Sequence, residues 1–361
     1  MRAATLLIAV LGLFGCSRSP LLDKPLVPPA IQASLAANGT ADGRARFREI
    51  FCAVEAARRG SAPAECDRLV LRLPGETSPA GGPVDLSAPR RPTRVIVVPG
   101  LYNECVKNLV TPFSDALPEL ERQGYRTQVL WVNGTSSTAH NARQIRDAVR
   151  AVPPEDTIIL VGHSKGVPDS LEALATYPEV GERVGALVSV AGSVGGSPLG
   201  DDPGALYGAL LRLVEWRCKG GDGGGRDSLK RRERAGFVSD ALARGALPAR
   251  VAYVSVVALA DPERMAALLK PGYRRLAKID PSNDGQVLAS DAIVPLGTLA
   301  GYVRADHWAI ALPFSSTSPV LAATLIRHNA FPRAILLEAL VRMATEEMSR
   351  RVTASPGRVR A

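Results

Sequence analysis

The sequence contains few histidines, aromatic residues and lysines, and the first two shortages each argue against a class of function. Only four histidines occur, and no cysteine or histidine cluster has the spacing of metal ligands, so we expect no metal site and no cofactor. Aromatic residues make up 5% of the chain and no basic run alternates with them, so nucleic acid is not an expected partner. Only seven of the 44 basic residues are lysines, and the net charge of +9 comes mainly from arginine. Either a solvated arginine-rich surface or a surface that faces an anionic lipid or polymer accounts for this charge.

The apolar run that opens the chain is shorter than a membrane-spanning helix. Arg2 supplies a positive charge, and residues 3–14 follow it as the apolar part of an export signal. Residues 13–16, Leu-Phe-Gly-Cys, resemble the lipobox of bacterial lipoproteins. The resemblance implies a signal peptide over residues 1–15 and a lipid anchor on Cys16. Because serine rather than aspartate follows the cysteine, it also implies the outer membrane of the bacterial cell envelope. An ordinary secretory signal with a coincidental cysteine is the alternative.

Four further cysteines follow, and an even number in an exported chain indicates disulfide bonds. Three pairings of these four residues are possible. Proximity in the sequence favours Cys52 with Cys66, which leaves Cys105 with Cys218.

The composition divides the chain into a tether, an extension and a main domain. Residues 16–45 are rich in proline, alanine, serine and glycine, which predicts a tether between the anchor and the folded part. Residues 46–92 are expected to form an N-terminal helical extension, in which apolar residues at helical spacing predict a helix over 45–59 that packs onto the main domain. The main domain is expected over 93–352, followed by a short tail to residue 361.

Short apolar strands alternate with helices from residue 93 onward. This alternation predicts the α/β class, with a mostly parallel sheet covered by helices on both faces and functional residues at the carboxyl ends of the strands. The alternation stops over residues 196–250, which we interpret as a helical cap inserted over the site; ordinary helices of the core fold are the alternative. The helix predicted over 333–351 is expected on the surface. The other predicted elements are strands over 94–98, 127–132, 157–161, 184–190, 251–258 and 299–303, and helices over 113–123, 139–152 and 168–177.

Residues 162–166, Gly-His-Ser-Lys-Gly, are the most informative motif of the chain. A serine between two glycines, after a β-branched strand and before a helix, is typical of a nucleophile elbow. The turn is tight, so the residues on either side of it must be nearly without side chains. It holds the hydroxyl of Ser164 above the sheet, beside a helix N-terminus whose free amides stabilise negative charge.

A nucleophilic serine needs a base within hydrogen-bond reach and a carboxylate that orients this base. In this type of elbow, the acid and then the histidine follow the serine along the chain. His140 precedes Ser164 and His163 lies inside the elbow, so His307 and His328 remain. We expect His307, in a loop after a predicted strand, to be the base, because His328 lies in or beside a helical segment and is better explained by surface exposure or packing.

Three aspartates are candidates for the orienting acid. Asp284 is favoured, because it lies in a short Ser-Asn-Asp-Gly turn in which Gly285 supplies conformational freedom. Asp291 is the alternative acid, and Asp261, just past a predicted strand, is the third candidate. Each of them can also be explained as an aspartate that caps a turn.

The elbow, the Asn-Asp-Gly turn and the histidine loop together resemble bacterial lipases and esterases of the α/β-hydrolase superfamily. The likeness covers about residues 93–313, and its motifs are specific for the superfamily but not for a substrate. It implies an α/β-hydrolase fold and a catalytic triad of Ser164, Asp284 and His307. It also implies an oxyanion hole formed by the backbone amides of Leu101 and Lys165.

The lysine after the nucleophile departs from the lipase pattern, since a cation in the first turn of a helix opposes the helix dipole. One hypothesis is that the ammonium of Lys165 pairs with an anionic group of the substrate or an acidic residue of the cap. The other is an ion pair with Asp169 or another carboxylate of the core.

These residues predict a membrane-anchored serine hydrolase that cleaves carboxylic esters through an acyl-enzyme on Ser164. Lipase, esterase, thioesterase and polyester depolymerase activities are all compatible with the motifs, and an apolar cap favours a hydrophobic ester or acyl substrate. A serine amidase is a weaker possibility. The alternative from another class is a non-catalytic envelope lipoprotein that uses this fold for binding.

Overall fold

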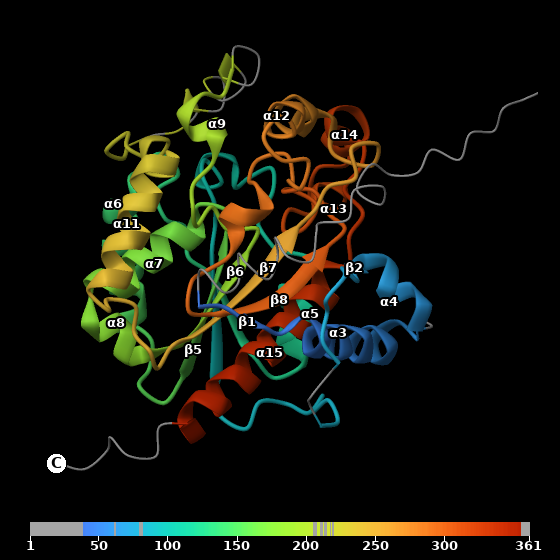
Figure 1. Ribbon diagram of the computed structural model, residues 1–361, viewed down its shortest axis with the longest axis vertical. Helices are drawn as coiled ribbons and strands as arrows, with labels where there is room; N and C mark the ends of the chain where they lie inside the picture. The colour runs from blue at the N-terminus through green and yellow to red at the C-terminus, as the bar shows by residue number, and fades with distance from the viewer. Residues whose placement is uncertain are drawn as a thin grey trace, which may run out of the picture.

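The centre of the molecule is a mostly parallel β-sheet, seen in a computed structural model (Figure 1). The structure describes residues 39–354, except 61–62, 79–81, 205–207, 210–211, 213–214, 217 and 219. The strands of this part of the chain are β1 (Ala41–Asp42), β2 (Val70–Leu71), β3 (Thr93–Val98), β4 (Arg126–Val129), β5 (Thr157–His163), β6 (Val184–Val190), β7 (Ala252–Ala258) and β8 (Thr298–Val303).

The strand order brings the ends of β3 and β5 together in the middle of the sheet. The strands lie in the order β1–β8–β7–β6–β5–β3–β4, and only β2 pairs antiparallel, with β8. After β4 the chain returns to the other side of β3 to form β5, and Val98 pairs in register with Gly162. Ligands bind at such a reversal of strand order in open α/β sheets, outside the carboxyl ends of the strands.

Helices cover both faces of the sheet, as the alternating pattern predicts (Figure 1). One face carries α3 (Arg44–Arg59), α5 (Leu117–Arg122) and α15 (Arg333–Ala354). The other carries α6 (Thr138–Arg150), α7 (Gly166–Thr176), α8 (Pro178–Arg183) and α11 (Arg231–Ala243). The shorter helices are α4 (Pro63–Leu69), α9 (Pro198–Asp201), α12 (Lys270–Leu276), α13 (Phe314–Thr317) and α14 (Pro319–Leu321).

The strands are apolar throughout because both faces of the sheet are buried. In β3, Val95 and Val97 pack with the α3 and α15 side, whereas Ile96 and Val98 pack with the α6 and α7 side. The six strands predicted in the main domain are confirmed, with ends that differ by up to three residues. The helix predicted from residue 113 begins only at Leu117, because Phe113 adopts a positive φ of 57° and donates its amide to the carbonyl of Ala311.

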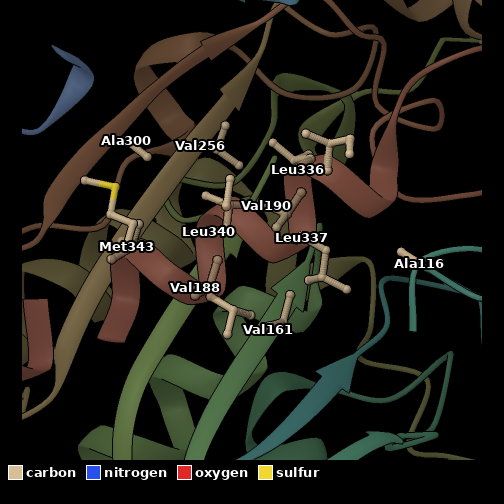
Figure 2. Close-up of a cluster of buried hydrophobic side chains, with 14 of the residues drawn as sticks. Ala116, Val161, Val188, Val190, Val256, Ala300, Leu336, Leu337, Leu340 and Met343 are labelled. Atoms are coloured by element: carbon tan, nitrogen blue, oxygen red, sulfur yellow. The ribbon is translucent and has the colours of Figure 1, made fainter. Parts of the chain in front are cut away.

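The prediction that the last helix lies on the surface is wrong. Figure 2 shows Leu336, Leu337, Leu340 and Met343 of α15 packed against strand residues such as Val190, and all four side chains are fully buried. Burial of each such side chain contributes about 1.5–3 kcal/mol. Because arginines and glutamates are interspersed along α15, the sequence conceals the apolar stripe that these residues form.

The N-terminal extension is part of the sheet rather than a separate layer. The predicted helix forms as α3 and packs against α15 and β8. However, the predicted tether ends too late, because β1 already pairs with β8 at Ala41 and α3 begins at Arg44. The predicted signal peptide, Cys16 and the final residues from 355 onward lie outside the described residues. No helix among the described residues combines the length and apolarity that crossing a membrane requires.

The two disulfide bonds that sequence proximity favours are confirmed. Cys52 and Cys66 join α3 to α4 with an S–S distance of 1.98 Å. Cys105 and Cys218 join the loop after β3 to the segment between β6 and β7, with an S–S distance of 2.02 Å. The second bond connects parts of the chain that are 113 residues apart, beside the end of the sheet where β3 and β5 meet.

Candidate active site

The nucleophile elbow lies at the carboxyl end of β5. Ser164 has a φ of 56°, a conformation that is rare for residues other than glycine and recurs at functional sites. Its side chain is 7% exposed and lies just before α7. The amide of Ser164 donates to the carbonyl of Val190 at the end of β6 (3.2 Å), which fixes the turn against the neighbouring strand.

Close packing explains the two glycines of the elbow. A Cβ atom at Gly166 would collide with the carbonyl oxygen of Val98. At Gly162 a Cβ atom would lie 2.8 Å from the amide nitrogen of Val167. The loop after β3 approaches just as closely, since a Cβ atom at Gly100 would lie 2.8 Å from the Cβ atom of Ser164. The prediction that the glycines on either side of the turn have no room for side chains is therefore confirmed.

The structure brings the three predicted triad residues into one hydrogen-bonded line. His307 Nε2 lies 2.8 Å from Ser164 Oγ, and His307 Nδ1 lies 2.6 Å from Asp284 Oδ2. The imidazole is 2% exposed and lies in the loop after β8. With Nδ1 protonated and bonded to the carboxylate, Nε2 presents its lone pair to the serine hydroxyl, which is the arrangement a general base needs.

Backbone amides hold the carboxylate of Asp284 in place. Oδ1 accepts hydrogen bonds from the amides of Gln286 (2.8 Å) and Val287 (2.7 Å), which leaves Oδ2 for the imidazole. Gly285 takes a φ of 96°, so the Asn-Asp-Gly turn uses the conformational freedom that the sequence predicts. The carboxylate is 2% exposed and is therefore screened from water.

The other candidate acids and bases lie elsewhere. The alternative acid Asp291 forms an ion pair with Arg231 at 3.3 Å and has no hydrogen bond to His307. Asp261 caps a turn by accepting the amide of Glu263 at 3.1 Å. His328 is exposed, as expected for a surface residue.

Two backbone amides near Ser164 have no hydrogen-bond acceptor among the described residues. The amides of Leu101 and Lys165 donate no hydrogen bond to any described residue. Lys165 stands at the N-terminus of α7, where the helix dipole adds a partial positive charge. Leu101 follows Gly100, whose close approach to Ser164 brings this loop to the nucleophile. The two amides thus have the positions and the free donors that the resemblance implies for an oxyanion hole.

The side chain of Lys165 points into the core, so the hypothesis that it pairs with a substrate anion is wrong. Lys165 is 1% exposed, and its Nζ donates to Asp169 Oδ1 at 2.6 Å one turn later on α7. Asn141 of α6 donates to the other oxygen of Asp169 at 2.8 Å. The buried pair compensates for the lysine at a helix N-terminus and ties α7 to α6.

An apolar cavity of about 240 Å³ opens above the triad. Ser164 and His307 form its floor. Twelve large apolar side chains make up most of its wall, from the loop after β3, the segment between β6 and β7, and the region 268–326. They are Leu101, Val106, Leu109, Val110, Leu199, Leu229, Leu268, Trp308, Leu312, Phe314, Leu321 and Ile326. An ester with a hydrophobic acyl chain fits such a lining.

Only part of the predicted cap lies over this cavity. Ser197, Leu199 and Leu229 line the cavity, whereas Ala241 of α11 packs with the core on the α7 side of the sheet. The helix α11 therefore covers the sheet rather than the cavity. For this helix, the alternative of an ordinary helix of the core fold is the correct one. Several residues of the predicted cap between 205 and 219 lie outside the described residues.

The sequence did not reveal two residues that support His307. His163, inside the elbow, is 1% exposed, and its Nε2–H donates to the carbonyl oxygen of His307 at 2.9 Å. Burial lowers the pKa of His163 to about 3, so this imidazole stays neutral. Asp306 accepts the amides of Trp308, Ala309 and Ala266 and so shapes the loop. An aspartate directly before the candidate base is a turn-capping signal that could have identified Asp306.

A mostly parallel sheet with this elbow and this order of serine, acid and histidine defines the α/β-hydrolase fold. The metagenomic carboxyl esterase MGS0156 is 42% identical, with a TM-score of 0.79 over 90% of this chain and 99% of that chain. The chain therefore belongs to the α/β-hydrolase family of this carboxyl esterase. The propeptide form of the Bacillus licheniformis lipase BlEst2 is 21% identical, with a TM-score of 0.51 over 70% of this chain and 54% of that chain, a likeness of fold alone. No protein-family model and no curated protein matches the chain.

Proposed function

We propose that the protein is a serine hydrolase that cleaves carboxylic esters through an acyl-enzyme on Ser164. The observation that carries this proposal is the imidazole of His307, which bridges Ser164 Oγ at 2.8 Å and Asp284 Oδ2 at 2.6 Å. The likeness to a carboxyl esterase over nearly the whole of that chain supports the same reaction class.

Each group of the site has one part in the proposed reaction. His307 Nε2 takes the proton of Ser164 as Oγ attacks the ester carbonyl, and Asp284 stabilises the resulting imidazolium. The amides of Leu101 and Lys165 donate to the oxyanion of the tetrahedral intermediate. The intermediate collapses to the acyl-enzyme, and the departing alcohol receives the proton from His307. Water, deprotonated by His307, then attacks the acyl-enzyme by the same route and releases the acid.

The lining of the cavity favours a hydrophobic acyl group of medium length. Leu109, Leu312 and Phe314 offer apolar surface next to the nucleophile, and each CH₂ that they remove from water contributes about 0.8 kcal/mol. We therefore expect kcat/KM to rise from acetyl to butyryl and hexanoyl esters, and to fall once the chain exceeds the cavity.

The test is hydrolysis of 4-nitrophenyl acetate, butyrate, hexanoate and palmitate by the purified full chain, beside the Ser164→Ala variant. We expect nitrophenol release that the variant lacks, and rapid labelling of wild type by a fluorophosphonate probe. Equal rates in both proteins, with no labelling, would leave only a binding function for this fold. Labelling that Ser164→Ala retains would assign the nucleophile to another residue.

A membrane anchor on Cys16 is the second part of the proposal. It is supported by the lipobox-like residues 13–16 at the end of the export signal. Several acyl chains on one cysteine bind a membrane stably, whereas one chain binds only reversibly. In a Gram-negative host, wild type should incorporate labelled palmitate and sediment with outer membranes, and Cys16→Ser should do neither. Incorporation that persists in Cys16→Ser would refute the anchor and leave the proposed reaction untouched.

A further inference from the structure

One arginine side chain lines the mainly apolar cavity. Among the described residues that line the cavity, Arg226 is the only basic side chain apart from the histidines, and none is acidic. Its side chain is half-buried, and it forms no ion pair or hydrogen bond with a described residue. Many other arginines among the described residues form ion pairs, for example Arg94 with Asp156 at 2.9 Å. An unpaired guanidinium beside a nucleophile is therefore a feature that the proposed reaction leaves unexplained.

The segment that carries Arg226 is anchored beside the loop after β3 that contains Gly100 and Leu101 (the oxyanion loop). Asp222 accepts hydrogen bonds from the amide of Ser137 (2.7 Å) and from its hydroxyl (2.6 Å). The amide of Gly225 donates to the carbonyl of Thr135 at 2.8 Å. A Cβ atom at Gly225 would lie 3.0 Å from the side chain of Leu101, so the residue before Arg226 packs directly on the oxyanion loop. Arg226 is thus presented to the cavity by an anchored backbone.

Tyr102, which also lines the cavity, supplies a second unused donor. It follows Leu101, adopts a φ of 61° and is 6% exposed, and its hydroxyl is buried without a hydrogen-bond partner among the described residues. Such strain and such an unpaired hydroxyl are costly and tend to occur at functional sites. Burial, together with the carboxylate of Glu215, raises the pKa of Tyr102 to about 12 although Arg226 opposes the shift, so the phenol remains a donor.

We propose that Arg226 and Tyr102 form a subsite for an anionic group of the substrate, and that the preferred esters carry a second, ionised carboxylate. A guanidinium offers paired N–H donors that match the two oxygens of a carboxylate, and the phenol adds a third donor. No acidic side chain among the described lining residues repels such a group. The substrate class is then a half-ester of a dicarboxylic acid, or an ester whose alcohol part ends in a carboxylate. This inference rests on the proposed ester hydrolysis.

Matched pairs of esters test the subsite. For an acyl-side charge, the pair is mono-4-nitrophenyl adipate and its methyl ester, in which a methyl group removes the charge of the distal carboxylate. For an alcohol-side charge, the pair is 6-butyryloxyhexanoate and its methyl ester, measured as butyrate released. With the full-length wild type, kcat/KM should favour the anionic member of at least one pair by roughly tenfold.

Variants separate a local subsite from the general positive charge of the protein. Arg226→Gln should bring the anionic-to-neutral ratio close to one, Arg226→Lys should retain part of the preference, and Tyr102→Phe should lower it several-fold. The matched control is Arg232→Gln on α11, an exposed arginine outside the cavity that changes the net charge equally and should leave the ratio unchanged.

Three outcomes would overturn the subsite. They are a wild-type preference for the neutral ester in both pairs, a ratio that Arg226→Gln leaves unchanged, and an equal loss of preference in Arg232→Gln. Hydrolysis of the neutral esters that is absent in Ser164→Ala would show in each case that the proposed reaction itself stands. Absence of Ser164-dependent hydrolysis from all four esters would instead refute the proposed function.

Discussion

Asp284 and His307 are joined twice, once through their side chains and once through their backbones. Asp284 Oδ2 lies 2.6 Å from His307 Nδ1, and the amide of His307 donates to the carbonyl of Asp284 at 3.0 Å. The two residues are 23 positions apart in the sequence and come from different loops. The double connection fixes the distance and the tilt of the imidazole relative to the carboxylate, so the base is oriented before substrate binds.

The double connection predicts the effect of removing the charge of Asp284. Asp284→Asn keeps the backbone bond but favours the wrong imidazole tautomer, so kcat should fall about 10⁴-fold, as in other enzymes with this triad. Asp291→Asn should retain at least half of the wild-type kcat, because Asp291 pairs with Arg231 instead. Steady-state kinetics on 4-nitrophenyl butyrate measure both. A larger loss in Asp291→Asn than in Asp284→Asn would reverse the assignment of the acid.

His163 should act as a positioning residue for His307. His163→Leu removes the N–H that binds the carbonyl oxygen of His307 at 2.9 Å, and we expect kcat to fall about 10–100-fold with little change in KM. His163→Gln can keep a donor at this position and should recover part of the loss. If both variants lose kcat equally, or if the thermal midpoint falls in parallel with kcat, the residue contributes packing rather than positioning.

The Lys165–Asp169 pair should be essential to stability as a pair. Both side chains are at most 1% exposed, and removal of one partner of a buried ion pair leaves an uncompensated charge, at a cost of about 3–5 kcal/mol. We expect urea unfolding to show this loss in Lys165→Met and in Asp169→Leu. The double variant should be more stable than either single variant. Additive losses in the double variant would show that the two charges do not interact.

Asp291 should make the stability of the protein depend on pH. Burial raises its pKa from 3.8 to about 6 although Arg231 opposes the shift, so the folded state binds this proton more tightly than the unfolded state. Protonated Asp291 therefore stabilises the folded state. This contribution to the free energy of unfolding is complete below pH 3.8 and is lost as the pH rises through 6. Asp291→Asn should remove this dependence and gain up to about 3 kcal/mol relative to wild type at pH 7. Urea midpoints at pH 4, 5, 6 and 7 measure the difference, and parallel profiles would contradict it.

The two disulfide bonds should differ in their effect on activity. The Cys105–Cys218 bond closes a loop of 113 residues and holds the loop that contains Leu101. Cys105→Ser with Cys218→Ser should therefore lower both kcat and stability, the latter by about 5 kcal/mol. Cys52→Ser with Cys66→Ser opens a loop of 14 residues between α3 and α4, neither of which lines the cavity. This variant should lower stability by about 3 kcal/mol without changing kcat. Thermal unfolding measures the loss of stability in both double variants, and steady-state kinetics measure their kcat. Equal kcat in both variants would show that the first bond does not support the oxyanion loop.

Local patterns were sufficient for the sheet and for the elbow. Strands buried on both faces are continuous apolar runs, so β6 could be predicted to the residue and the other strands of the main domain nearly so. The glycines of the elbow follow from a turn that has no room for a Cβ atom. The order of serine, acid and histidine along the chain then limited the base to two residues.

The burial of α15 and the partner of Lys165 could not be predicted in this way. An apolar stripe interrupted by charges is compatible with a surface helix until the sheet and α3 are present to cover it. The ammonium of Lys165 could pair with a substrate or with the core, and only the depth of α7 in the structure selects Asp169.

The sequence alone therefore determined the α/β class and the elbow around Ser164, because each depends on residues close together in the chain. It also determined the disulfide partners, because the proximity of Cys52 and Cys66 left only Cys105 with Cys218. The tertiary structure decided which carboxylate meets His307, how His163 supports it, and that Arg226 and Tyr102 share a wall with Ser164. These relationships join segments separated by 23 to more than 140 residues. Their distances depend on how the sheet aligns the ends of its strands, which no local pattern encodes.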